Sequence, residues 1–425
     1  MSKRLLSVLG AGGWRNVVAP DAAFSFLPFN IQKLGTIYKA DPTFDLQTYA
    51  NITVAETYYV DIATGSDSND GLTEANALQN VSTAISKADA STVYVKAGIY
   101  PKGHGWDAVT PARSLEVIGY GGDVILSYHQ HELVWTAADS HYTCPATIEV
   151  ISVFDTTNVD TNGDMVKLVK KSNEAEVDAT VNSWWWDSNV LYLHTFDSRN
   201  PGDTVYPYLT GSNGQQDDAV TYYLENLKFW GGYHAFSRSS TNAAAKTYAK
   251  NCEFSYGHSG NGFTILGAGE TILQDCLAVK SVFDGYKNVE LGGTYSNTVL
   301  IDCTGRSNGS GGSSAANGIS RHDRGSTVVI NGDYYENVGR NWHDVHAGVG
   351  DSMSWGVGVR CANSTANINF ACGQDTGNPK MWLEGCISET ASTGDIQSGT
   401  GATVYYRKMN PITPSQTGGG TFTAY

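Results

Sequence analysis

A segment of about 25 residues recurs along the second half of this 425-residue chain. In each of its first five copies a Thr and a run of β-branched or aromatic residues lead to an Asn or an Asp. These residues are Asn226, Asn251, Asp275, Asp302 and Asn331. A period near 25 residues with one short apolar strand per copy is typical of a solenoid, and strands this short predict β-coils rather than helix pairs.

The composition supports many short strands joined by turns. The chain has 47 Gly and 24 Tyr but only 11 Pro, and charged residues make up 16% against 41% hydrophobic residues. Abundant apolar residues and few charges exclude a disordered chain. The seven cysteines are odd in number and form no CxxC pair, which argues against a disulfide framework or a zinc site. Cys252, Cys276 and Cys303 keep the phase of the repeat, so we expect an inward stack.

The net charge of −15 and the isoelectric point near 5.0 argue against nucleic acid or an anionic membrane surface as the main partner. No apolar run approaches the roughly 20 residues of a membrane-spanning helix. Lys3 and Arg4 precede a short apolar run that Arg15 interrupts, which is a poor match to a signal peptide. We expect synthesis in a reducing cytoplasm, no membrane insertion, and no cofactor.

The segment that opens the predicted solenoid carries a recognisable order of elements. A strand at Tyr58–Asp61 leads into a Gly/Ser/Asn/Asp turn, and Val81, Ala84, Ile85 and Ala88 form one face of an amphipathic helix of about ten residues. Strands at 92–100, 114–122 and 124–128 follow. This order resembles the start of pectate-lyase-like right-handed parallel β-helix proteins, in which the helix caps the open end of the coil. The resemblance implies an all-β, single-stranded parallel β-helix.

Five segments are expected along the chain. Residues 1–56 form an irregular arm whose six aromatic residues need a partner surface, and 57–128 hold the cap helix and first coils. Residues 129–215 form an inserted β-rich subdomain, 216–390 the main β-helix, and 391–425 C-terminal strands. The run Trp184-Trp185-Trp186 in the insertion is read either as a sugar-stacking platform or, more commonly, as a small core.

A second register places polar residues on neighbouring coils. Asn261-Gly262, Asp284-Gly285 and Asn317-Gly318 each precede a strand, which aligns GYKNVEL (285–291), GISRHDR (318–324) and WHDVHAG (342–348). Stacked strands lie about 4.7–4.9 Å apart, so equivalent residues of adjacent coils can touch. The candidate catalytic residues are Asp284, Glu290, His322, Asp323, His343 and Asp344. The candidate substrate-binding residues are Lys287, Arg321, Arg324, Arg340 and Trp342.

These residue types suit the cleavage of a polysaccharide. Glu290 and Asp323 are expected at equivalent places about 5 Å apart, the carboxylate separation of a retaining glycosidase. His322 or His343 could replace a carboxylate as the base of a lyase. His343 and His346 point to opposite faces of a strand, so no metal site is predicted. The glycine- and serine-rich loop 306–316 is either a lid over a groove or a surface loop. For the candidate catalytic and substrate-binding residues as a whole, the alternative is a solvent-exposed polar face without a function in catalysis or binding.

The cap, the repeats, the polar stripe and the N-terminus together resemble a bacteriophage tailspike. The resemblance implies a homotrimer located in the virion tail and assembled in the host cytoplasm. It also implies attachment to a tail or adaptor protein through residues 1–56, and cleavage or binding of a bacterial surface polysaccharide, either lipopolysaccharide O-antigen or capsule. The chain departs from many tailspikes because it lacks a long C-terminal trimerisation region. A non-catalytic glycan-binding adhesin and a secreted bacterial polysaccharide lyase remain alternatives.

Overall fold

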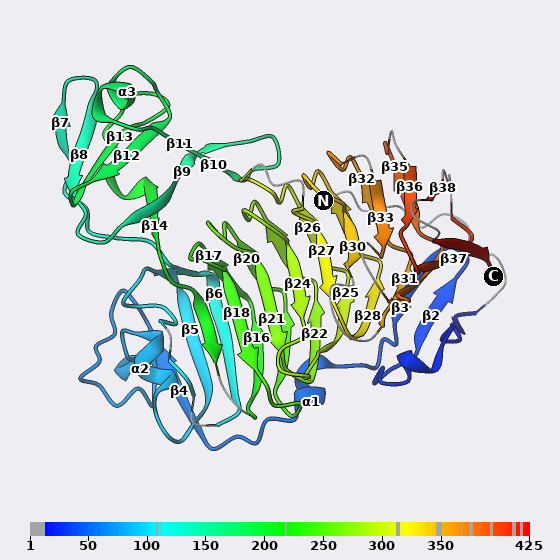
Figure 1. Ribbon diagram of the computed structural model, residues 1–425. Helices are drawn as coiled ribbons and strands as arrows, with labels where there is room; N and C mark the ends of the chain where they lie inside the picture. Colours follow the sequence, from blue (N-terminus) through cyan, green and yellow to red (C-terminus); the bar gives the residue numbers. More distant parts are fainter. Residues whose placement is uncertain are drawn as a thin grey trace.

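The structure is a computed structural model, and it describes residues 13–425 except 108, 112, 217–218, 312–314, 346–350, 367, 374–376, 392–393, 410–413 and 417–419. It is a parallel β-helix, as predicted, in which three stacks of parallel strands enclose one continuous apolar core (Figure 1). The first coils come from β4 (Glu56–Val60), β5 (Ala90–Tyr100) and β6 (Leu115–Ser127), which pair in parallel in this order.

The three stacks are a nine-stranded sheet, a sheet that faces the N-terminal arm and a sheet of short strands. The nine-stranded sheet comprises β15 (Asn213–Gln216), β18 (Phe236–Ser240), β21 (Phe263–Gly267), β24 (Tyr286–Val289), β27 (Ile319–His322), β30 (Trp342–Val345), β33 (Ile368–Cys372), β36 (Gly394–Ser398) and β38 (Pro414–Gln416). The arm-facing sheet comprises β16 (Thr221–Glu225), β19 (Lys246–Lys250), β22 (Glu270–Gln274), β25 (Asn297–Ile301), β28 (Gly325–Ile330), β31 (Ser352–Val357), β34 (Lys380–Glu384), β37 (Thr403–Arg407) and β39 (Thr421–Ala424). The short-strand sheet comprises β17 (Leu227–Trp230), β20 (Glu253–Ser255), β23 (Leu277–Val279), β26 (Thr304–Arg306), β29 (Asp333–Tyr335), β32 (Arg360–Ala362) and β35 (Ile387–Glu389).

The repeated Asn and Asp make the sharp turn between the arm-facing and short-strand sheets. Each adopts a left-handed backbone with φ between 52° and 57°, a conformation that Asn and Asp tolerate best among residues with a side chain. Asn251 Nδ2 donates to Asn226 Oδ1 over 2.7 Å and so links successive coils. A Cys follows three of these turn residues, and Cys252, Cys276 and Cys303 all point into the core; all seven cysteines are buried and free. The predicted inward stack is therefore confirmed.

The opening of the coil differs in detail from the prediction. The cap helix α2 (Val81–Ile85) is only five residues long, although Val81, Ala84 and Ile85 are fully buried against the first coils as expected. The two strands predicted at 114–122 and 124–128 are one long strand, β6, which bends at Gly121 with φ 81°. Because β6 bends there, its first half pairs with β16 and its second half with β17.

The N-terminal arm lies along the outer face of the arm-facing sheet. Its elements are the turn η1 (Ala22–Phe24), β1 (Arg15–Asn16), β2 (Ile31–Leu34), β3 (Ile37–Ala40) and α1 (Leu46–Ala50). Phe24 packs on Trp355 and Trp382 with ring centroids 5.5 Å away in both cases, and Tyr49 packs on Tyr248. The arm runs from the late coils back to the early ones, so the chain itself supplies the surface that covers its aromatic residues (Figure 1).

A buried carboxylate fixes the arm to the late coils. Glu384, 1% exposed, binds Lys33 Nζ at 2.8 Å and Arg407 Nη2 at 2.5 Å. We expect Glu384→Gln to weaken arm docking by about 2 kcal/mol, because hydrogen bonds to charged groups contribute about 1.5–3 kcal/mol. Limited proteolysis should then cut the arm faster. Glu389→Gln, which removes an exposed partner of Arg360, is the control, and equal cleavage rates for the two variants would contradict the expectation.

The segment between β6 and β15 forms two antiparallel or mixed sheets with their own core (Figure 1, upper left). One contains β9 (Val150–Val159), β10 (Met165–Lys167) and β14 (Val205–Leu209). The other contains β7 (Thr136–Ala138), β8 (His141–Pro145), β11 (Val169–Lys170), β12 (Ser183–Asp187) and β13 (Val190–His194), with α3 (Glu174–Asp178) beside it; η2 (Glu74–Asn76) and η3 (Gly202–Thr204) are short 3-10 turns. The β9–β10 hairpin is tied to the coil because Arg306 Nη2 binds Asp164 and Lys280 binds Asp160.

No helix in the described part of the chain is long and apolar enough to cross a membrane.

Candidate functional site

The outer face of the nine-stranded sheet carries most of the polar stripe. Phe263, Tyr286 and Ile319 pair in register, which confirms the predicted alignment of the first two polar strands. The same register places Thr264, Lys287, Ser320 and His343 in one outward row. Leu266, Val289, His322 and Val345 form the next outward row.

The third polar strand lies one residue away from its predicted register. Ile319 pairs with Trp342 rather than with His343. Because side chains alternate between the two faces of a strand, this shift of one residue turns every side chain of β30 to the opposite face. Trp342 is therefore fully buried in the coil core, where the glycan-binding role predicted for it would require exposure.

Arg321 and Asp344 also point into the coil. They are paired in register on β27 and β30, and they are 1% and 0% exposed. Arg321 donates to Ser326 O and Thr327 Oγ1, over 3.5 and 3.4 Å. Burial raises the pKa of Asp344 to about 6 and lowers the pKa of Arg321 to about 10. A ligand on the outer face cannot contact either side chain.

A pocket of about 390 Å³ opens on the outer face of β21, β24 and β27. Its walls combine strand residues with residues of the turns that precede the strands. The lining residues are Tyr233, His234, Gly260, Asn261, Thr264, Leu266, Phe283, Lys287, Val289 and His322. Tyr233 and Phe283 are 47% and 38% exposed, which is unusual for aromatic side chains. The pocket thus joins exposed rings to three groups that can carry a proton.

A ladder of hydrogen-bonded side chains begins at Asn261, one of the residues that line this pocket. The Asp284 N–H donates to Asn261 Oδ1 over 2.9 Å, and the N–H and side-chain amide of Asn317 both donate to Asp284 Oδ1. Asn261, Asp284 and Asn317 occupy equivalent places in successive coils, and Asp284 is the charged member. Its other oxygen, Oδ2, lies 3.5 Å from Lys287 Nζ. Burial raises the pKa of Asp284, although Lys287 and the Asn317 donors oppose this effect.

Two histidines of the pocket are held in the neutral form. Burial, together with the nearby Lys287 ammonium, lowers the pKa of His234 and of His322 to about 4. His234 Nδ1 accepts the Asn261 N–H over 3.0 Å, and a Cβ at Gly260 would lie 2.4 Å from this nitrogen. His322 Nε2 lies 3.0 Å from Ser320 Oγ. A neutral imidazole can accept a proton from a substrate at neutral pH.

The remaining predicted residues lie beyond the pocket lining. Glu290 and Asp323 directly follow the register pair Val289–His322, and Arg324 Nε lies 3.4 Å from Glu290 Oε2. Arg340 Nη2 donates to Gln397 Oε1 over 3.3 Å. His343 belongs to the outward row but is only 3% exposed, and burial lowers its pKa far below the ordinary value. His346 and residues 312–314 of loop 306–316 lie outside the described residues.

The turn residues of the pocket could not be found from the repeat. Tyr233, His234 and Phe283 belong to turns of unequal length that do not share the phase of the strands. The segment by which the insertion rejoins the coil holds these turns in place. The His234 N–H donates to Ser212 Oγ over 3.1 Å, and His258 Nε2 lies 2.8 Å from Leu209 O. The sequence signal that could have indicated this part of the site is the pair Tyr233-His234, which follows soon after the insertion.

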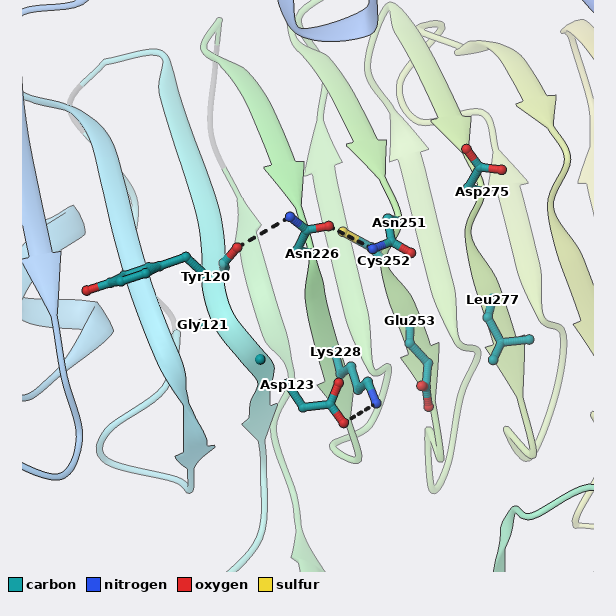
Figure 2. A pocket seen from close by; sticks show the side chains of 12 residues that line it. Tyr120, Gly121, Asp123, Asn226, Lys228, Asn251, Cys252, Glu253, Asp275 and Leu277 are labelled. Atoms are coloured by element: carbon teal, nitrogen blue, oxygen red, sulfur yellow. Dashed lines mark hydrogen bonds and ion pairs between the residues drawn. The ribbon is translucent and has the colours of Figure 1, made fainter.

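A second pocket, of about 430 Å³, lies on the outer face of the short-strand sheet (Figure 2). Its charged groups already have partners within the chain. Lys228 Nζ binds Asp123 Oδ2 at 2.8 Å, and Trp230 Nε1 donates to Glu253 Oε1 over 2.7 Å. Burial raises the pKa of Glu253. The pocket continues the turn ladder of Asn226 and Asn251, so we assign it a role in holding the coils together.

Among the described residues, no group of three or more His, Cys, Asp or Glu side chains is placed to hold a metal ion.

The sequence matches no protein-family model and none of the curated proteins. The structure is similar to a solved structure described as "Glycoside hydrolase", with a TM-score of 0.62 and 9% identity over 87% of this chain and 96% of that one. It is also similar to XylC in complex with xylose, with a TM-score of 0.45 and 12% identity over 83% of this chain and 69% of that one. Pectate lyase Pel9A gives a TM-score of 0.37 and 12% identity over 87% and 82% of the two chains. The first likeness shows a shared fold.

Proposed function

We propose that this chain binds and cleaves a polysaccharide in the pocket on the nine-stranded sheet. The observation that carries the proposal is the pocket itself, in which exposed Tyr233 and Phe283 border Lys287, His322 and His234. Aromatic rings pack against the apolar faces of sugars, and the ionisable groups can move protons. The shared fold with a structure described as a glycoside hydrolase supports the same class of activity.

The groups that line the pocket favour β-elimination from an acidic sugar. His322, neutral because its pKa is about 4, takes the proton from the carbon next to the uronate carboxyl. The electron pair forms a double bond as the neighbouring glycosidic oxygen leaves, and water protonates that oxygen. Lys287, held by Asp284, offsets the charge that develops on the carboxylate. Asp284 itself acts as a positioning residue because it lies behind Lys287.

Hydrolysis is the second candidate, and a separate observation favours it. Glu290 and Asp323 follow paired positions on adjacent strands, as the carboxylate-pair hypothesis requires. In that reaction one carboxylic acid protonates the leaving oxygen while the other group activates water or attacks the sugar.

Product analysis on extracted bacterial surface polysaccharides tests the proposal and separates the two reactions. New reducing ends together with ultraviolet absorbance of an unsaturated product indicate elimination, and reducing ends alone indicate hydrolysis. Lys287→Met should abolish most cleavage, whereas Asp123→Asn in the second pocket should leave it intact. Binding without cleavage of any glycan would favour the adhesin and count against the proposal.

The acid limit of the activity is a further expected result. A base with the ordinary His pKa of 6.5 loses activity as the pH falls through that value, whereas His322 with a pKa of about 4 stays unprotonated to about pH 4. We therefore expect kcat/KM to fall on the acid side only near pH 4. Initial rates measured across this range check it, and an acid limb near 6.5 would exclude His322 as the base.

The wider biological role is also a proposal. We propose that the polysaccharide is bacterial O-antigen or capsule and that the chain is a homotrimeric phage tailspike. The arm carries exposed apolar side chains at Trp14, Val18 and Ile37, which support attachment to a tail protein. Light scattering of the purified chain tests the trimer, and a monomer at all concentrations would contradict it.

A further inference from the structure

The insertion carries a half-exposed aromatic pair on the outer face of its five-stranded sheet. Trp185 on β12 pairs in register with Tyr192 on β13, and their ring centroids lie 4.9 Å apart with an interplanar angle of 29°. The preceding residue, Trp184, points the other way and is 1% exposed in the core of the insertion. Trp184 therefore belongs to the small core that was one of the two interpretations of the tryptophan run, and Trp185 lies on the opposite face of the strand.

Polar groups border this pair. Helix α3 covers one end of the same face, where His141 lies 3.4 Å from Glu174 Oε1 and 3.2 Å from Asp178 Oδ1. The His141 ring is 5.9 Å from the Tyr192 ring, so the acidic helix stands beside the aromatic pair. Thr143 on β8 continues the row next to Tyr192. The surface thus offers ring carbons together with carboxylate and hydroxyl groups.

The charge of the insertion restricts what this surface can hold. Residues 129–215 contain twelve Asp and Glu but only four Lys and Arg, a net charge of −8 out of −15 for the chain. Such a surface repels nucleic acid, phosphate and uronate. Carboxylates accept hydrogen bonds from neutral hydroxyls, and aromatic rings pack on the C–H face of a pyranose. An uncharged sugar ring meets both requirements.

We infer that Trp185 and Tyr192 form a second glycan-binding site, which holds uncharged sugar units of a polysaccharide outside the pocket. The inference rests on the proposed function, since it assigns this site to the same polymer. After β14 the chain rejoins the coil through residues 210–212, where Ser212 Oγ accepts the N–H of His234, a residue that lines the pocket. A polysaccharide bound at Trp185 and Tyr192 is therefore held by the same chain that carries the pocket.

Binding by the full chain tests the site independently of cleavage. The probes are cellohexaose, xylohexaose, chitohexaose and maltohexaose, titrated by calorimetry. We expect at least one to bind, and Trp185→Ala and Tyr192→Ala each to weaken that binding about 10-fold, the effect of losing one aromatic contact of about 1–1.5 kcal/mol. Tyr192→Phe should keep most of the affinity. Phe196→Ala, which removes a different aromatic ring of the insertion, one that is 40% exposed, is the control.

The outcomes separate this inference from the proposed function. Trp185-dependent binding that persists in His322→Gln, with no glycan cleaved by the wild type, supports the second site and contradicts the proposed enzyme. Cleavage with binding that is unchanged in Trp185→Ala and Tyr192→Ala does the reverse. Failure of the wild type to bind any probe, or equal losses in Phe196→Ala, overturns the second site.

Discussion

His322→Gln is expected to lower kcat/KM on the cleaved polysaccharide by about 10²–10⁴-fold, the usual contribution of a positioned general base. Glutamine can keep a hydrogen bond to Ser320 Oγ, which lies 3.0 Å from His322 Nε2, but it cannot accept a proton. The loss should appear in kcat rather than in KM, since the sugar still meets Tyr233 and Phe283. Initial rates on a defined oligosaccharide, with product absorbance as the readout, measure it.

A matched control separates proton transfer from a general loss of histidine. His131 lines a different pocket, at the base of the insertion, so His131→Gln should leave the rate within about 2-fold of the wild type. If His322→Gln retained full activity while Glu290→Gln or Asp323→Asn lost it, hydrolysis by the carboxylate pair would replace elimination. Full activity in all three variants would remove this part of the outer face from the mechanism.

Asp344→Asn is expected to stabilise the coil by about 3 kcal/mol above about pH 6. Asp344 is fully buried, and its oxygens find no hydrogen-bond donor at bonding distance among the described residues. Burial raises its pKa from 3.8 to about 6, even though Arg321, Ser354 and Trp342 favour the ionised form. A shift of about two pKa units corresponds to roughly 3 kcal/mol at about 1.4 kcal/mol per unit.

The sign of this effect follows from which state holds the proton. Below about pH 4 the carboxyl is protonated in both the folded and the unfolded chain, so the wild type and the Asp344→Asn variant differ little in stability. As the pH rises from about 4 to about 6 the unfolded chain ionises first, and the folded wild type loses stability. The thermal unfolding midpoints of the two proteins should therefore diverge over this interval. Parallel pH profiles would show that Asp344 is ionised in the folded chain without penalty.

The sequence predicts the architecture well because the architecture is periodic. Asn226, Asn251 and Asp275 take the same left-handed turn, and the Cys that follows each of the last two enters the core. The sequence repeat therefore predicts both the turns and the buried cysteines. The first two polar strands are aligned by the Gly that precedes them. The cap helix is shorter than its periodicity suggests because the chain turns into β5 after Ile85.

The sequence predicts only those residues of the candidate site that lie on strands. Lys287 and His322 lie on outward positions of aligned strands and do line the pocket. Asn341 directly precedes β30, at the place that Gly285 and Gly318 take before β24 and β27, and the resulting slip of one residue sends Trp342 and Asp344 inward. Tyr233 and Phe283 come from turns, whose lengths vary from coil to coil. A strand period of two residues carries no information about such turns, so half of the pocket could be found only from the coordinates.

The N-terminal arm can complete its packing only after the late coils have been synthesised. Residues 13–52 leave the ribosome before any coil exists, yet the surface that covers Phe24 is built from Trp355 and Trp382, and the carboxylate that binds Lys33 is on β34. Phe24 and Lys33 therefore lack these partners until more than three hundred later residues have been synthesised and wound. Nascent chains stalled before β34 should consequently be more prone to aggregation than the finished protein, because part of the arm still exposes its apolar side chains.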